Sequence, residues 1–151
     1  MKVRRLGRGD DDAVRAASHL FDGPARDEAT SRFLADPSHH LLIAYEDERP
    51  AGFVSGVELT HPDKGTEMFL YELSVDEPWR RRGIGRALVE ELGALARERG
   101  CYGMFVLTAR DNDAALATYQ TAGVLRDDGW VMFTWEPPGS AASPGSAAPV
   151  P

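Results

Sequence analysis

The sequence of 151 residues is poor in the features that mark disulfide-stabilised, membrane-spanning or secreted proteins. Its single cysteine, Cys101, excludes an internal disulfide and a cysteine zinc cluster. No apolar run approaches the roughly 20 residues that a membrane-spanning helix needs, so we expect no membrane partner. The first residues contain no apolar stretch of the kind found in secretory signals. We therefore expect a protein of the reducing cytoplasm.

The chain also lacks an excess of positive charge, because its formal net charge is −7. Binding to a nucleic-acid backbone needs a net or local basic excess, so we expect no nucleic-acid partner. The field of an acidic protein draws in cationic ligands. The composition therefore favours a small cationic substrate.

Signatures of metal binding and of a serine nucleophile are missing as well. The histidines have no ligand spacing, and the adjacent pair His39 and His40 points to opposite faces of an expected strand, so we expect no metal site. No serine lies in a nucleophile elbow. Cys101 follows a helix end and is interpreted as structural.

Two segments of different composition divide the chain. Residues 137–151 contain only proline, glycine, serine, alanine and valine, which cannot bury enough apolar surface to offset the entropy of ordering. We expect this tail to be disordered and residues 1–136 to form one domain.

The domain alternates short strand patterns with amphipathic helices in the order β-α-α-β-β-β-α-β-α-β. This order predicts a mixed α/β fold (an α+β mixed sheet), with a right-handed parallel crossover around the central helix. Period-two patterns predict strands at residues 2–6, 39–47, 52–60, 66–75, 103–109 and 130–136. Helical spacing predicts helices at residues 10–21, 25–36, 83–100 and 111–123.

The segment EPWRRRGIGRALVEELG, residues 77–93, places arginines and two glycines directly before a helix. The spacing fits neither a P-loop nor a dinucleotide fingerprint, because Arg86 and Leu88 stand where those motifs need other residues. A more general mode of phosphate binding still fits the segment, because free N–H groups at a helix start, together with the helix dipole, bind an anion. The alternative is that the arginines only face solvent at the start of the helix and bind no ligand.

The pattern Arg-x-x-Gly-x-Gly at Arg80, Gly83 and Gly85 resembles the pyrophosphate turn of the GNAT acyltransferase superfamily. A second GNAT pattern, Asn-x-x-Ala-x-x-x-Tyr followed by Gly and an apolar residue, matches Asn112, Ala115 and Tyr119. The resemblance covers residues 1–136 and implies a GNAT fold that binds acetyl-coenzyme A. It implies cofactor contacts from Leu73, Ser74, Val75, Arg80, Arg81, Arg82, Gly83, Ile84, Gly85, Arg86, Asn112, Ala115 and Tyr119.

Two residues are candidates for catalysis of acetyl transfer to an amine. Glu72 is a carboxylate inside an otherwise apolar strand, where burial is costly unless it is paired or functional. It can bind an ammonium group and accept its proton, directly or through water, unless it simply faces solvent. Tyr119 lies where the GNAT resemblance implies a general acid, and its alternative role is helix-face packing. Strand alternation places Tyr71 on the opposite face from Glu72.

The strand and turn FLYELSVDEPWRRRGIGRALVEEL resemble the aminoglycoside 3-N-acetyltransferases within the GNAT superfamily. This resemblance implies the 3-amino group of an aminoglycoside as acceptor, and hence antibiotic resistance. Two departures bear on the substrate: the strand acid of that subfamily is usually Asp, and the segment between the first two helices is short here. The acidic residues expected to bind the cationic substrate are Asp22, Asp27, Glu28, Glu72, Asp127 and Asp128.

Other functions stay open at this point. The acceptor can be another small amine, such as streptothricin, a polyamine or an amino acid derivative, or it can be a protein N-terminus. A non-catalytic acyl-coenzyme A sensor belongs to a different class. The apolar strand expected at residues 130–136 favours an interface, and we expect a homodimer.

Overall fold

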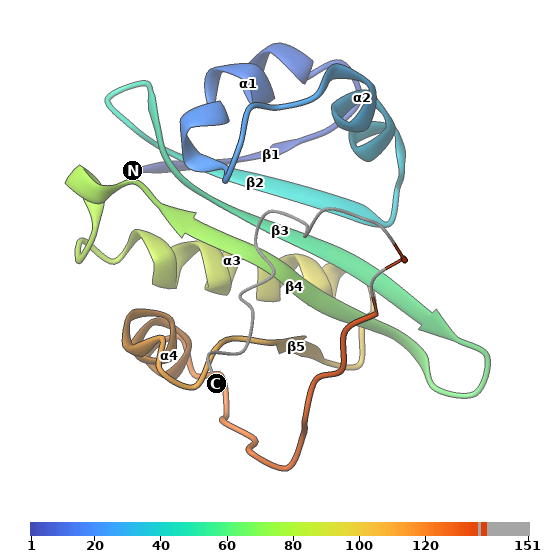
Figure 1. Ribbon diagram of the computed structural model, residues 1–151. Coiled ribbons are helices and arrows are strands. Elements are labelled where there is room, and N and C mark those ends of the chain that lie inside the picture. The colour runs from blue at the N-terminus through green and yellow to red at the C-terminus, as the bar shows by residue number, and fades with distance from the viewer. Residues whose placement is uncertain (136, 139–151) are drawn as a thin grey trace.

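The computed structural model describes residues 1–135 and 137–138, and five strands form one twisted sheet (Figure 1). The strands lie in the order β1-β2-β3-β4-β5, with β1 to β4 antiparallel and β5 parallel to β4. Their bounds are β1 Lys2–Leu6, β2 His39–Glu46, β3 Arg49–His61, β4 Gly65–Val75 and β5 Met104–Val106. The mixed GNAT fold predicted from the sequence is confirmed.

Helices cover the two faces of this sheet unequally. On one face, α1 (Asp11–Ala16), a 3-10 turn (Ser18–Leu20) and α2 (Asp27–Ala35) pack on β2 and β3. On the other face, α3 (Ile84–Glu98) crosses β3 and β4 and makes the parallel connection between β4 and β5. Helix α4 (Asp113–Thr121) packs beside α3 (Figure 1). A second 3-10 turn, Glu77–Trp79, precedes α3.

The main core lies between the sheet and α3. The helix predicted at residues 83–100 is confirmed as α3, and its apolar face is buried through Ile84, Leu88, Leu92 and Leu95. They pack against sheet residues such as Val54, Met68 and Leu70. The N-terminus of α3 is thereby fixed beside the end of β4.

Leu92→Ala is expected to lower the free energy of unfolding by about 2–5 kcal/mol, because Leu92 is fully buried and its removal leaves a cavity. Denaturant unfolding followed by circular dichroism measures this loss. The matched control is Leu59→Ala, since Leu59 is 45% exposed at the end of β3. Equal losses in the two variants would contradict the proposed position of the core.

The C-terminal part of the described chain differs from the expectation. The strand predicted at residues 130–136 is wrong, because residues 130–135 lie outside any helix or strand and Glu136 lies outside the described residues. The strand predicted at 103–109 is reduced to Met104–Val106. A period-two pattern shows that a segment suits a strand, but the segment also needs a neighbouring edge with which to pair. The expected tail, residues 137–151, lies outside the described residues except for Pro137 and Pro138.

Within the described residues, no helix is long and apolar enough to cross a membrane. The same part of the chain contains no group of three or more His, Cys, Asp or Glu side chains arranged to hold a metal ion.

Candidate active site

In the turn before α3, the backbone N–H groups, and not the arginine side chains, are arranged to bind an anion. Gly83 precedes the helix with φ 82°, and Arg81 also has a left-handed φ of 59°. No side chain caps the start of α3 in the described structure. The first N–H groups of the helix therefore remain available, and alternating backbone conformations of this kind form a concave anion site.

The arginine side chains around this turn have separate local partners. Arg80 Nε donates to the carbonyl oxygen of Val75 at 2.9 Å, and Arg86 Nε donates to Glu90 at 2.7 Å. The guanidinium of Arg82 lies 4.9 Å from the ring centroid of Trp79. Arg80 and Arg82 thus contact residues that lead into the turn, Arg86 pairs within α3, and the cofactor contacts expected of the arginines stay predictions.

The two glycines of the turn are required for different reasons. Gly83 has open space around the position of a Cβ, so its left-handed backbone is what favours glycine. At Gly85, by contrast, a Cβ would lie 3.1 Å from Cγ2 of Thr118. Gly85 therefore allows α4 to approach α3 closely.

Strands β4 and β5 pair only over a short stretch and then part. Their register joins Met68, Phe69 and Leu70 to residues 104–106, and β4 continues to Val75 without a partner on that side among the described residues. The backbone of Leu73, Ser74 and Val75 therefore borders a gap in the sheet. This gap is where the sequence resemblance implies a pantetheine arm.

Helix α4 brings the second group of candidate residues to the other side of this gap. Asn112 caps the helix, because its Oδ1 accepts a hydrogen bond from the N–H of Ala115 at 3.1 Å. This capping explains the spacing of these two residues, and their contact with cofactor stays a prediction. Tyr119 packs partly buried against the α3 core, and burial raises the pKa of its phenol. A raised pKa keeps the phenol protonated and able to donate.

A β-bulge sets the direction of Glu72. Ser55 of β3 lies opposite Glu72 and Gly56 lies opposite Leu70, so Tyr71 has no partner of its own in this register. The prediction that alternation places Tyr71 on the opposite face from Glu72 is wrong, because the bulge lies between them; the Tyr71 ring contacts Phe69, with centroids 5.6 Å apart, and is 67% exposed. A bulge interrupts the alternation of faces, and the prediction assumed an unbroken strand.

Glu72 shares this face with a second carboxylate. Burial and, secondarily, the nearby charge of Asp22 raise the pKa of Glu72 above its ordinary value. Across the strand pair, Ser55 is buried and its hydroxyl has no hydrogen-bond partner among the described residues. The sequence contained no sign of this hydroxyl, since a serine in a strand is ordinary. Together these groups form a polar patch suited to an ammonium group.

Three of the other acidic residues expected at the substrate site have partners elsewhere. Asp27 pairs with Arg15 at 2.9 Å, and Asp128 pairs with Arg110 at 3.0 Å and with Arg126. Asp127 accepts hydrogen bonds from Gly129 and from the indole of Trp130. Glu28 lies on α2 beside a hollow that Arg26 and Arg32 also line. Of the expected set, Asp22 is the residue whose charge contributes to the raised pKa of Glu72.

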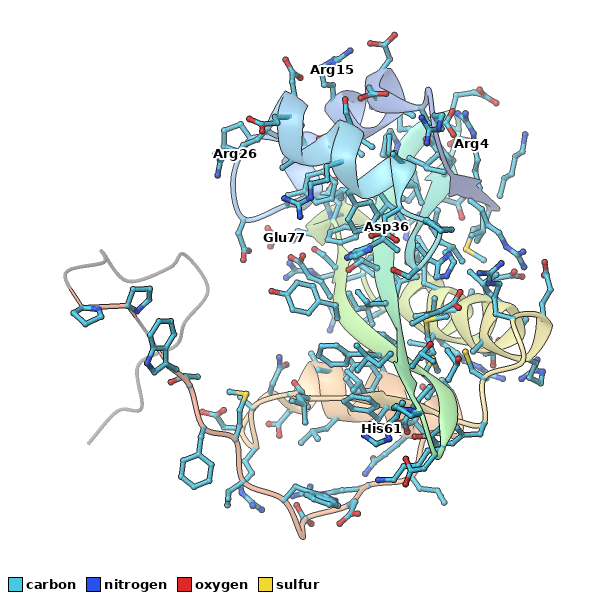
Figure 2. The ribbon with its side chains drawn as sticks, turned by 90° about the vertical axis from the view of Figure 1, so that its right-hand side faces the viewer. Arg4, Arg15, Arg26, Asp36, His61 and Glu77 are labelled. Atoms are coloured by element: carbon cyan, nitrogen blue, oxygen red, sulfur yellow. The ribbon has the colours of Figure 1, made fainter. Side chains whose placement is uncertain are left out.

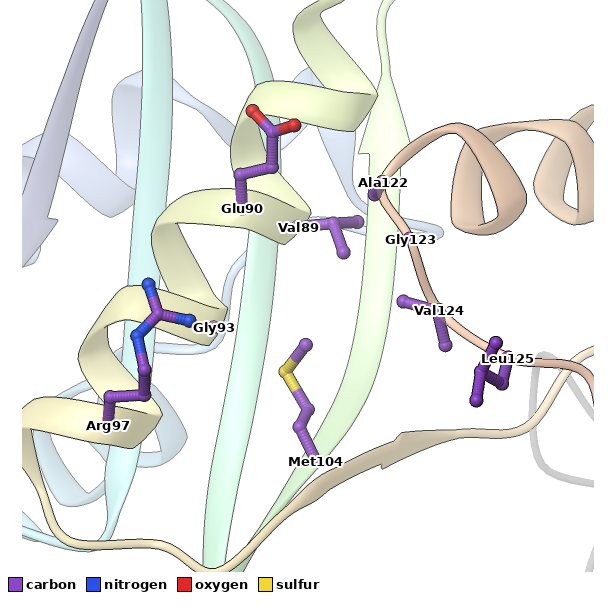
Figure 3. Close-up of a pocket in the computed structure, with 9 residues that line it drawn as sticks. All are labelled: Val89, Glu90, Gly93, Arg97, Met104, Ala122, Gly123, Val124 and Leu125. Atoms are coloured by element: carbon purple, nitrogen blue, oxygen red, sulfur yellow. The ribbon is translucent and has the colours of Figure 1, made fainter.

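The described part of the protein also has a hollow of about 450 Å³ between α3, β5 and the chain after α4 (Figure 3). Its lining includes Val89, Arg97, Met104 and Leu125 but neither Glu72 nor Tyr119. We place the candidate active site at the parted strands, because the polar chemistry lies there.

Glu72 and Tyr119 lie on opposite sides of the sheet, and the gap between β4 and β5 connects the two sides. The roles of the α3 turn, Glu72 and Tyr119 in acyl transfer, which the GNAT resemblance implies, stay predictions. The Acetyltransferase (GNAT) family model matches residues 11–124, and the chain belongs to that family. It is an acyltransferase, and acetyl-coenzyme A is its acetyl donor.

Individual relatives act on different amines. The chain is 36% identical over 121 residues to the N-alpha-acetyltransferase RimI of Mycobacterium tuberculosis, covering 76% of this chain and 73% of RimI. An aminoglycoside acetyltransferase from an uncultured soil metagenomic sample superposes with a TM-score of 0.73 at 26% identity, over 92% of this chain and 98% of the other. Another such enzyme, solved with trehalose, has a TM-score of 0.82 at 22% identity, over 89% and 95%, and shows the shared fold.

Proposed function

We propose that this protein transfers the acetyl group of acetyl-coenzyme A directly to a cationic amine, with the 3-amino group of an aminoglycoside as first candidate. The observation that carries the proposal is the place of Glu72, a half-buried carboxylate opposite the buried hydroxyl of Ser55, with the charge of Asp22 near it. Two negative charges at one acceptor site suit a ligand with more than one ammonium group. The exposed ring of Tyr71 on the same face adds an apolar surface for a sugar ring.

In this proposal Glu72 has two tasks. As a carboxylate it binds the substrate ammonium, and it then accepts the proton that the nitrogen must lose before it attacks. The proton passes directly or through a water shared with the hydroxyl of Ser55. The nitrogen–carbon bond forms as the carbon–sulfur bond breaks, and Tyr119 donates a proton to the departing sulfur. Free N–H groups at the start of α3 hold the coenzyme phosphates.

A second candidate is the α-amino group of a protein N-terminus. The identity of 36% with RimI favours it. Such a peptide carries one ammonium group at the acceptor site, so it makes less use of the Asp22 and Glu72 pair than an aminoglycoside does.

Thiol release from acetyl-coenzyme A, measured with a panel of amines, separates the two candidates. The panel contains gentamicin, kanamycin, apramycin, streptothricin, spermidine and a short peptide with a free N-terminal alanine. Turnover with aminoglycosides, followed by NMR of the product, supports the first candidate and locates the acetyl group. Turnover with the peptide and with none of the aminoglycosides would exclude an aminoglycoside as the substrate.

Asp22→Asn is expected to shift the acid limb of kcat/KM to lower pH. The charge of Asp22 raises the pKa of Glu72, so its removal lets Glu72 lose its proton at a lower pH. The measurement is a pH profile of kcat/KM for the best amine. Asp27→Asn is the matched control, because Asp27 is paired with Arg15 and its loss should leave the limb in place. If the acid limb of the pH profile did not shift in Asp22→Asn, the charge of Asp22 would not be a cause of the raised pKa of Glu72.

A further inference from the structure

We propose that Ser55 is a positioning residue, whose hydroxyl donates a hydrogen bond to the carboxylate of Glu72 when that side chain turns inward. The hydroxyl oxygen of Ser55 is buried and has no hydrogen-bond partner among the described residues. Leaving a buried polar group unpaired is costly, so this hydroxyl needs a partner that the described conformation does not supply. The catalytic meaning of the hydrogen bond rests on the proposed function of Glu72 as the base.

The strand register places Glu72 where it can accept from Ser55. The two residues lie opposite each other on β3 and β4, and side chains paired in this way have Cβ atoms about 4.5–5.5 Å apart. On the other side of β3, Ser55 lies opposite the apolar Leu41 of β2. Its neighbours on the same face of β3 are Phe53 and Val57, which are apolar as well. The carboxylate of Glu72 is therefore an acceptor within reach of the hydroxyl, after rotation of the glutamate side chain.

The described structure shows the outward position of the Glu72 carboxylate, in which it does not bond to Ser55. The titratable side chains beside it are Tyr71 on its own strand and Asp22, which lies between the 3-10 turn Ser18–Leu20 and α2. The charge of Asp22 acts on Glu72, and its repulsion favours the inward position when no cation is bound. An ammonium group between the two carboxylates removes this repulsion and draws Glu72 outward.

The β-bulge lies where this rotation takes place. Tyr71 has no partner in the register between β3 and β4, so the ladder is interrupted directly beside the pair of Ser55 and Glu72. Bulges are common next to active sites, where they change the direction of a side chain. The inserted residue also widens the spacing of side chains along β4 at this point. Glu72 is therefore packed less tightly by its own strand than a residue in a regular ladder.

Ser55 and Asp22 act on the protonation of Glu72 in opposite directions. Burial and the charge of Asp22 raise the pKa of Glu72 and favour its neutral form. A hydroxyl that donates to the carboxylate favours the ionised form instead. The same chemistry operates elsewhere in the chain, where the hydroxyl of Ser38 donates to Asp36 at 2.7 Å and lowers the pKa of that carboxyl. Ser55 thus keeps Glu72 ionised until the amine arrives.

The first test follows the protonation of Glu72 directly and needs no amine. Carbon NMR of the full chain, labelled at the glutamate carboxyl carbons, gives the titration of Glu72, whose signal is identified by its loss in Glu72→Gln. In Ser55→Ala this titration should move to higher pH, because the ionised carboxylate loses a donor. Ser55→Thr keeps a hydroxyl and should titrate as the wild type does.

Ser38→Ala is the matched control for this titration. Its hydroxyl also donates to a carboxylate, but that carboxylate belongs to Asp36 at the end of α2 (Figure 2). The control should therefore leave the titration of Glu72 in place. An unchanged titration of Glu72 in Ser55→Ala would overturn the proposal.

The second test measures kcat/KM against pH with an amine that the wild-type enzyme acetylates. Ser55→Ala should move the acid limb to higher pH, opposite in sign to Asp22→Asn. The variant should lose about 10-fold in kcat/KM at acid pH, in keeping with a hydrogen bond to a charged group. It should lose almost nothing at alkaline pH, where Glu72 is ionised in both proteins. An equal loss at every pH would mean that Ser55 only shapes the site, and the proposal would fail.

The two tests together separate this proposal from the proposed function. If the NMR titration moved in Ser55→Ala and the acid limb did not, the hydrogen bond would stand but Glu72 would not be the base. If the titration moved and no amine were acetylated, the hydrogen bond would stand and the proposed function would fall.

Discussion

Replacing Glu72 by glutamine is expected to lower kcat/KM for the amine substrate by about 10²- to 10⁴-fold, the usual contribution of a general base. Glutamine keeps the size of the side chain and its place opposite Ser55 on the bulged strand. It cannot accept the proton of the ammonium group, and it removes one of the two negative charges at the acceptor site. Both changes act on the amine, so binding of acetyl-coenzyme A should stay the same.

Steady-state thiol release and calorimetric titration with coenzyme measure these two properties separately. Glu67→Gln is the matched control: Glu67 lies on the same strand, but its carboxylate accepts a hydrogen bond from Tyr102. That variant should keep both turnover and coenzyme affinity. If Glu72→Gln turned over amine at the wild-type rate, the base would have to be another group. If it lost coenzyme binding, the role of Glu72 would be structural.

The sequence predicted the frame of the site because the frame depends on local patterns. The apolar spacing from Ile84 to Leu95 defines the buried face of α3, and the glycines before it define where the helix begins. The polar Glu72 in an apolar strand indicated a functional carboxylate before any neighbour was known. Each of these signals lies within one segment of the chain.

The features that the sequence could not predict depend on pairing between segments. The bulge at Tyr71 arises from the register between β3 and β4, and one skipped residue reverses the face on which the ring lies. The spacing of Leu70 and Leu73, three residues apart on the core side, is the one trace of the bulge in the sequence. Asp27 looked like a substrate ligand because its partner, Arg15, lies on another helix; for Asp128 the neighbouring Arg126 was a sequence signal of local pairing.

Replacing Tyr119 by phenylalanine is expected to lower kcat by about 10²-fold, near the lower end for general acid catalysis, because a thiolate departs more readily than most leaving groups. Phenylalanine preserves the ring that packs on the α3 core, so the fold and the coenzyme affinity should be retained. Burial raises the pKa of the Tyr119 phenol, so the wild-type enzyme should keep its donor up to alkaline pH. The loss in the variant should therefore be nearly constant across neutral pH.

Single-turnover measurements at saturating coenzyme and amine isolate the acetyl-transfer step from product release. Tyr102→Phe is the control, since its hydroxyl donates to Glu67 and its ring is 58% exposed. If Tyr119→Phe kept the wild-type single-turnover rate, the sulfur would leave without protonation by this phenol. Tyr119 would then be a packing residue that closes one side of the gap between β4 and β5. If the rate fell together with coenzyme affinity, the hydroxyl would instead act in binding.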